Sequence, residues 1–124
     1  MIRMVQRRLI IPRGDTGSFS IPFNVAIAAG DVAVFSIFDT LTRKTVFEKE
    51  ITLTGEEELL TIPFTHEDTV NLSAKKYLWD IKIYSEPVRD EDNILIGGTA
   101  INSYYAAFFL PICEIKEVAE NVPR

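Results

Sequence analysis

The stretch Lys76-Tyr77-Leu78-Trp79-Asp80-Ile81-Lys82-Ile83-Tyr84 decides the fold class of this chain. Its large apolar side chains, from Tyr77 to Ile83, fall at every second position, and the charged Asp80 and Lys82 lie between them. Alternation of this kind is typical of a β-strand with one buried face and one more polar face. Tryptophan, tyrosine and isoleucine favour strands because they fill a pleated, half-buried surface. We therefore expect this stretch to be the central strand of a β-sandwich, with the rest of the chain packed around Trp79.

Similar patterns recur along the chain at a spacing of roughly ten residues, with turn residues between them. Besides the central stretch, the segments with a strand pattern are residues 5–11, 17–23, 31–39, 44–53, 59–64, 94–102 and 103–113. No long segment has a convincing helical period. Together these patterns predict an all-β, antiparallel sandwich or barrel of about seven to nine strands.

Single residues refine these strands. Pro22 has no N–H to donate, so residues 17–23 are expected at a sheet edge or at a strand end. Lys49 shares a face with Phe47 and Ile51, which places its strand near an edge or beyond a bulge. The Gly97-Gly98 pair predicts a bulge or a close crossing within residues 94–102.

The connections also carry signals. Thr65 is followed three residues later by Asp68, a pattern that resembles a capping box and predicts one short helical turn. Residues 86–93 read as a charged loop. Asp90 to Asn93 offers several oxygen ligands, but four consecutive side chains point in different directions and calcium needs six or more convergent oxygens. We therefore expect a solvated hairpin tip there and no metal site.

Length and composition limit the function classes. A chain of 124 residues with 47% hydrophobic residues forms one domain, residues 1–124, with a core of about 5–113 and a polar tail of 114–124. A net charge of -5 argues against a nucleic-acid partner. No apolar run is long enough for a membrane-spanning helix, and the first residues do not form a signal peptide. One cysteine, Cys113, leaves no internal disulfide and fits a protein made and kept in a reducing cytoplasm.

Catalytic and metal-binding motifs are absent from the sequence. The single histidine, His66, has no partner set for zinc and is expected to be exposed in a polar turn. Neither a nucleophile elbow nor a phosphate-binding loop occurs. Arg13-Gly14-Asp15 spells an adhesive tripeptide, but the following Thr16-Gly17 makes a simple turn sufficient. We therefore expect no enzyme activity, no cofactor and no metal.

Two segments, residues 19–23 and 104–110, carry less charge than the strand at residues 44–50 and are therefore less protected against pairing with another chain. A sheet edge without charge is a template for pairing with another chain. The aromatic segment 103–113 is apolar on both faces, which is typical of either a central strand or a contact between subunits. The candidate interface residues on the two segments are Phe19, Ile21, Phe23, Tyr104, Tyr105, Phe108 and Phe109.

Three motifs follow one another in order: residues 13–21, with Gly14-Asp15-Thr16; residues 61–72, with Glu67-Asp68-Thr69; and residues 76–83, with Trp79-Asp80-Ile81. Together they resemble small phage and prophage structural proteins, and in particular the N-terminal domain of baseplate upper proteins of phages of Gram-positive bacteria. The resemblance covers residues 5–102. It implies an immunoglobulin-like β-sandwich that acts as a non-catalytic assembly module of a tail or baseplate. The chain departs from that pattern after Ile101, where no long receptor-binding region follows. The role that the resemblance implies for this chain is therefore a stand-alone adaptor and not a receptor-binding protein.

The leading hypothesis is therefore a structural module of a phage or prophage particle, made in the bacterial cytoplasm and located in the virion tail or baseplate if a phage encodes it. Its partners would be other phage structural proteins or further copies of itself, as a homo-oligomer. A carbohydrate-binding sandwich is the alternative, and it predicts exposed, coplanar aromatic rings at Tyr84, Tyr104 and Tyr105. A small enzyme on a β-scaffold is the third hypothesis, and it predicts a pocket of convergent polar groups. The fold by itself does not decide among these, because function lies in sites.

Overall fold

The chain folds as an all-β sandwich in a computed structural model that describes residues 1–5, 8–23, 25–103 and 112–117. The described part contains nine strands and one helical turn. Their bounds, in chain order, are β1 Arg3–Val5, β2 Arg8–Pro12, β3 Gly17–Pro22, β4 Val32–Phe38, β5 Thr45–Thr52, β6 Leu59–Phe64, α1 His66–Thr69, β7 Lys76–Arg89, β8 Leu95–Ser103 and β9 Ile112–Lys116. The predicted fold class is confirmed.

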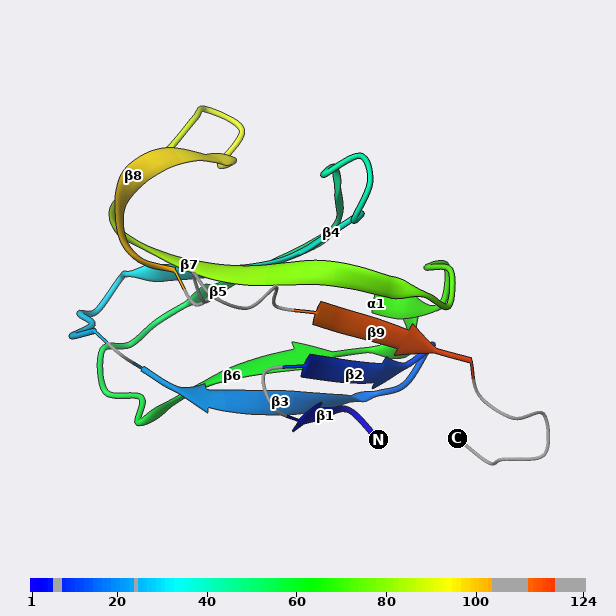
Figure 1. The fold of residues 1–124 in the computed structure, drawn as a ribbon. Helices are drawn as coiled ribbons and strands as arrows, with labels where there is room; N and C mark the ends of the chain where they lie inside the picture. The colour runs from blue at the N-terminus through cyan, green and yellow to red at the C-terminus, as the bar shows by residue number, and fades with distance from the viewer. Residues whose placement is uncertain (6–7, 24, 104–111, 118–124) are drawn as a thin grey trace.

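The strands form two layers (Figure 1). The larger sheet has the order β1-β2-β9-β7-β4-β5, with β8 also pairing with β7, and the smaller sheet consists of β3 and β6. All pairs are antiparallel except β2 and β9, which run parallel with Leu9 opposite Cys113 and Ile11 opposite Ile115. The sheet is therefore mixed, and the purely antiparallel arrangement expected from the sequence is corrected at this pair.

β7 is the central strand, as predicted. One edge pairs with β4 from Leu78 to Tyr84, and the other pairs first with β9 and then with β8. The inward side chains of β7 are the alternating set read from the sequence: Tyr77, Trp79, Ile81 and Ile83, all at most 4% exposed. The alternation of large apolar residues therefore fixes both the position and the face of this strand.

Aromatic rings fill the space between the sheets. Phe35 of β4 is fully buried, and its ring centroid lies 5.6 Å from that of Phe19, 5.6 Å from that of Phe64 and 6.1 Å from that of Trp79. Ring pairs at such distances add to the stabilisation from burial. The core thus joins β3 and β6 of the small sheet to β4 and β7 of the large one.

Lys49 reaches across the sandwich. It lies on the inner face of β5, an edge strand as predicted, and its Nζ donates to the Pro63 carbonyl and to Asp68 Oδ2, both at 2.8 Å. Asp68 Oδ2 also accepts from the Thr65 N–H at 2.8 Å, which caps the helical turn predicted from these residues. A charged side chain is tolerated on an apolar face here because its stem packs inside and its ammonium group finds partners at the rim.

Three segments differ from the sequence-based expectation. The segment 5–11 is divided between β1 and β2, which pair antiparallel with Arg3 opposite Ile10. The central strand continues to Arg89, past Pro87, where a loop was expected. The last strand runs to Lys116, beyond the expected start of the polar tail, because Ile115 is buried there.

Candidate functional site

A hairpin arm stands clear of the sandwich (Figure 1). We define the arm as residues 85–98, from the second half of β7 through the turn into β8. The pairing register shifts between Ser85 and Val88, and Glu86 adopts a positive φ of 50°. Opposite them Gly98 has a φ of 137°, and a Cβ placed there would lie 3.1 Å from Pro87 Cα. This bulge bends the ribbon away from the sheet, as bulges do, and it confirms the predicted irregularity at Gly97-Gly98.

The arm exposes large apolar side chains. Val88 is 51% exposed, Ile94 59% and Ile96 62%. Single exposed apolar residues are common on protein surfaces, but three on one short hairpin form a patch of the kind that marks a contact site. Because each is already partly buried, its complete burial would stabilise a complex by only about 1–2 kcal/mol before the costs of association.

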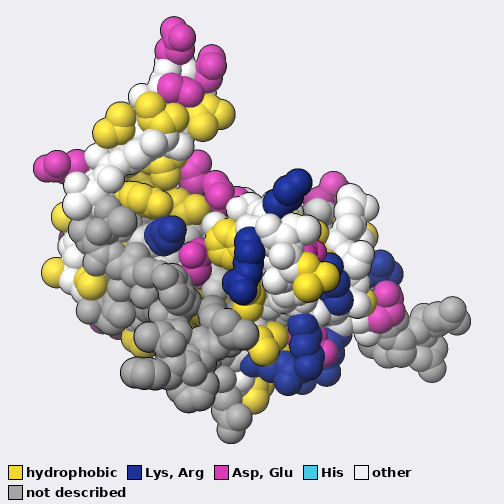
Figure 2. Space-filling model, turned by 45° about the horizontal axis from the view of Figure 1, so that its top comes forward, with side chains coloured by type: hydrophobic (Ala, Val, Ile, Leu, Met, Phe, Trp, Pro, Cys, Tyr) yellow, Lys and Arg dark blue, Asp and Glu magenta, His cyan; other side chains and the backbone are white. Residues whose placement is uncertain are grey.

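The tip of the arm is acidic. Asp90, Glu91 and Asp92 are exposed, as Figure 2 shows for the acidic side chains at the end of the protrusion. Asp90 Oδ1 accepts from the N–H groups of Asp92 and Ile94, both at 2.9 Å, so this carboxylate holds the turn. No cluster of potential metal ligands occurs in the part of the chain that the structure describes. The tip is the solvated hairpin end that the sequence predicts.

An ion pair fixes the arm against the body. Arg89 Nη2 lies 2.9 Å from Glu50 Oε1 of β5, and Arg89 Nη1 donates to the Asn93 carbonyl at 3.1 Å. The arginine thus ties the turn of the arm to the far edge of the large sheet. Because both groups are partly exposed, the pair orients the arm more than it stabilises the fold.

Lysine and arginine side chains gather on the large sheet, away from the arm tip (Figure 2). Residues directly opposite each other on neighbouring strands share a face, and the pairing places Arg3, Ile10, Glu114 and Lys76 in one such row. Arg8 and Lys116 lie two residues along on β2 and β9, and therefore on the same face. We call Arg3, Arg8, Lys76 and Lys116 the basic face, and Glu114, which pairs with Arg8, is the carboxylate among them.

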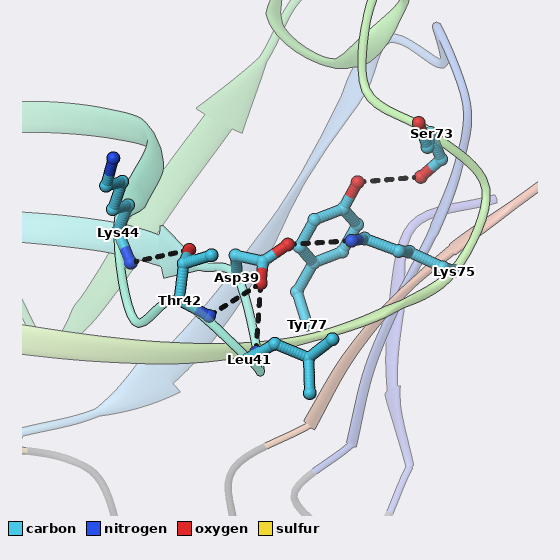
Figure 3. A network of polar contacts seen from close by, with 7 residues as sticks. All are labelled: Asp39, Leu41, Thr42, Lys44, Ser73, Lys75 and Tyr77. Carbon is cyan, nitrogen blue, oxygen red and sulfur yellow. Dashed lines mark hydrogen bonds and ion pairs between the residues drawn. The ribbon is translucent and has the colours of Figure 1, made fainter.

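A polar network joins the β4–β5 turn to the start of β7 (Figure 3). Lys75 Nζ lies 2.7 Å from Asp39 Oδ2, while Asp39 Oδ1 accepts from the N–H groups of Leu41 and Thr42. The Lys75 hydrogen bond and these backbone donors lower the pKa of Asp39, and the Asp39 carboxylate raises the pKa of Lys75. The Asp39 carboxylate thus holds the β4–β5 turn and ties it to Lys75, which makes the network structural.

The first two motifs of the resemblance contact each other. The Gly14 N–H donates to Thr69 Oγ1 at 2.9 Å, and His66 Nδ1 lies 2.7 Å from the Gly14 carbonyl oxygen. Gly14 has a φ of 75°, which explains the glycine in this turn. The tripeptide Arg13-Gly14-Asp15 is therefore built into the fold as a turn, and His66 is exposed as predicted.

The candidate interface residues of β3 lie against the protein's own core. Phe19 is 5% exposed, and Ile21 and Phe23 pack against the core cluster. Phe19 thus serves the core of the domain, whereas Ile21 and Phe23 remain partly accessible, and a subunit contact through these side chains stays a prediction. The other candidates, Tyr104, Tyr105, Phe108 and Phe109, lie outside the described residues.

The described part of the chain has no exposed aromatic ring that could stack on a sugar and no exposed cysteine that could react. Trp79 is 4% exposed, Tyr84 is half-buried, and none of the large hydrophobic side chains exposed there is aromatic. Cys113 is buried, and burial raises the pKa of its thiol to about 12. A reactive cysteine needs the opposite shift and access to solvent.

Comparisons of this chain with protein-family models, with curated proteins and with solved structures find no match. No helix in the described ranges is long and apolar enough to cross a membrane.

Proposed function

We propose that this chain is a non-catalytic assembly module that binds other protein chains through its arm, as a structural component of a phage or prophage tail or baseplate. The observation that carries the proposal is the arm itself, a fixed protrusion whose Val88, Ile94 and Ile96 are each more than half exposed. Hairpins that extend apolar side chains beyond their own core are suited to a neighbouring protein surface.

Two further features support this role. The three motifs of the resemblance hold one another in place, since the Gly14 turn binds α1 and the Trp79 strand packs over Phe19. In addition, the Asp39–Lys75 network, which brings a carboxylate and an ammonium group together, holds the β4–β5 turn. The resemblance supplies the tail or baseplate setting, and the arm supplies the means of contact.

The test uses particles from the bacterium whose genome encodes the chain. The gene is deleted and replaced by the wild type, by the arm variant Ile94→Asp/Ile96→Asp, or by the control Leu41→Asp, which changes a residue that is 90% exposed on the β4–β5 turn. Particles are then labelled with gold-conjugated antibodies raised against the purified chain. We expect label at the tail or baseplate with the wild type and the control, and loss of label with the arm variant. Particles that never carry label, while the lysate contains the protein, would overturn the proposal.

A further inference from the structure

We propose that the arm binds a second copy of this chain, and that the arm of one copy docks on the basic face of the next in a head-to-tail arrangement. The inference deepens the proposed function and rests on it, because it names the partner of the same arm.

The charges of the two surfaces are complementary. The arm carries four carboxylates, at Glu86, Asp90, Glu91 and Asp92, and one arginine. The basic face carries four cations, at Arg3, Arg8, Lys76 and Lys116, and one carboxylate, Glu114. Complementary surfaces of this kind steer association and fix the orientation of the partner.

Apolar side chains accompany the charges on both surfaces. Val88, Ile94 and Ile96 are exposed on the arm, and Val5 of β1, opposite Arg8, is 45% exposed beside the basic face. A contact between the two surfaces would therefore bury aliphatic groups at its centre and place ion pairs around them. That is the usual division between the core and the rim of a protein interface.

The arm cannot reach the basic face of its own chain. Arg89 holds it to Glu50 on β5, at one edge of the large sheet, while β1 forms the opposite edge. The basic face reaches from β1 to the start of β7 at Lys76, and nine residues of extended strand, about 30 Å, separate Lys76 from Ser85 at the base of the arm. The complementary surfaces can therefore meet only between two molecules, and a contact between two different patches produces rings or open chains of subunits.

The experiment measures the molar mass of the full chain by light scattering, over a series of protein concentrations at low and at high salt. The arm variant is Glu91→Lys/Asp92→Lys, which leaves Asp90 in place because its carboxylate holds the turn. The face variant is Arg3→Glu/Lys76→Glu, which leaves the Arg8–Glu114 pair intact. A control for the arm variant, Glu56→Lys/Glu58→Lys, makes the same charge change as that variant on exposed residues between β5 and β6.

The wild type and the control should exceed the monomer mass of 14.0 kDa as concentration rises, and high salt should reverse the effect. Each charge variant alone should associate at least about tenfold more weakly than the wild type, because like charges then meet. An equimolar mixture of the two variants should regain the wild-type association, since each presents the surface that the other lacks. Misfolding of either variant would not produce that recovery, and circular dichroism of each variant provides a direct check.

Two results would overturn the inference: a wild type that stays monomeric at every concentration in low salt, or a mixture of the variants that stays monomeric. Both are distinct from failure of the proposed function. Label on particles together with a monomeric wild type would leave the assembly role standing with a different partner, whereas particles without label would remove the role itself.

Discussion

Phe35 is the side chain on which the two sheets meet. It is fully buried and contacts rings from both layers, including Phe47 at a centroid distance of 6.2 Å. Replacing it with alanine removes these contacts and leaves a cavity that the rigid sheets cannot close. We expect Phe35→Ala to lower the free energy of unfolding by about 3–5 kcal/mol in urea titrations followed by Trp79 fluorescence. Phe35→Leu, the matched control, should cost clearly less, and equal losses in both variants would contradict the role of ring packing.

The buried carboxyl group of Asp80 makes the stability of the protein depend on pH. It is 8% exposed on the outer face of β7, opposite Ser36, and burial raises the pKa of its carboxyl, an effect that Lys82 opposes and Glu48 reinforces. Because the folded state disfavours the charged form, ionised Asp80 destabilises the protein at neutral pH. That penalty fades as pH falls through the raised folded value, and it is gone below the ordinary aspartate value of about 3.9.

Asp80→Asn should therefore unfold at a higher urea concentration than the wild type at pH 7, and the difference should disappear at about pH 3.5. Urea titrations of both proteins at the two pH values measure this. An advantage of the asparagine variant that persists unchanged at the lower pH would show that charge burial is not its cause.

At the scale of elements, Lys49 and Asp68 hold the edge strand β5 against the small sheet. Burial alone would raise the pKa of Asp68, but the Lys49 ammonium and the Thr65 N–H outweigh it and lower the pKa. The contribution of Asp68 is thus present above the ordinary aspartate pKa and is lost as pH falls through the lowered folded value. Lys49→Met should cost about 1 kcal/mol.

Asp68→Asn should cost more than Lys49→Met, since it weakens both the ion pair and the cap of α1. The double variant gives the coupling between the two side chains in a thermodynamic cycle. Strictly additive losses would mean that the two groups stabilise the protein independently.

The bend of the arm depends on Gly98. Its φ of 137° is unfavourable for other residues, and a Cβ would press on Pro87 and on the Ser85 carbonyl oxygen. Gly98→Ala should cost about 1–3 kcal/mol of local strain and raise amide hydrogen exchange in residues 85–98. Gly97→Ala is the matched control, because a Cβ there meets nothing within 4 Å. Equal exchange in the two variants would show that the bend does not rest on this glycine.

The elements show which features local sequence determines. β4, β6 and β7 follow from alternation and apolar density, and the α1 turn follows from Thr65 and Asp68. The parallel pairing of β2 with β9 could not be predicted from the sequence. It joins residues about a hundred positions apart, and a local pattern does not show which strand pairs with which. The arm was also missed, since the charges and Pro87 in residues 86–93 suggested a loop. Gly97-Gly98 was the one signal available, and it indicated a bulge without showing that the bulge bends a hairpin outward.

At the scale of the whole molecule, Cys113 reports on cooperative unfolding. It lies fully buried in β9, between β2 and β7, and burial raises the pKa of its thiol to about 12. We expect a disulfide reagent at pH 8 to modify it only as fast as the protein unfolds globally, and the rate to rise with urea as the unfolding rate does. Rapid modification of the native protein would show that β9 opens locally while the rest of the sheet stays intact.

The distribution of charge is likewise a property of the whole chain. The arm and the basic face have opposite signs and lie at opposite ends of β7, with Arg89 orienting the arm toward β5. The net charge of -5, taken alone, conceals this polarity. The sequence could not reveal it, because the basic face is assembled from four strands that come together only in the fold.

The parallel pairing of β2 and β9 also has a mechanical consequence. The chain enters β2 at one end of the pair and leaves β9 at the other, with Leu9 beside Cys113 and Pro12 beside Lys116. A pulling force transmitted along the chain through both strands would therefore slide them past each other and load their hydrogen bonds together. Antiparallel terminal strands would instead peel apart one bond at a time. The β2–β9 pair is therefore the part of the large sheet that would meet a force along these two strands in shear.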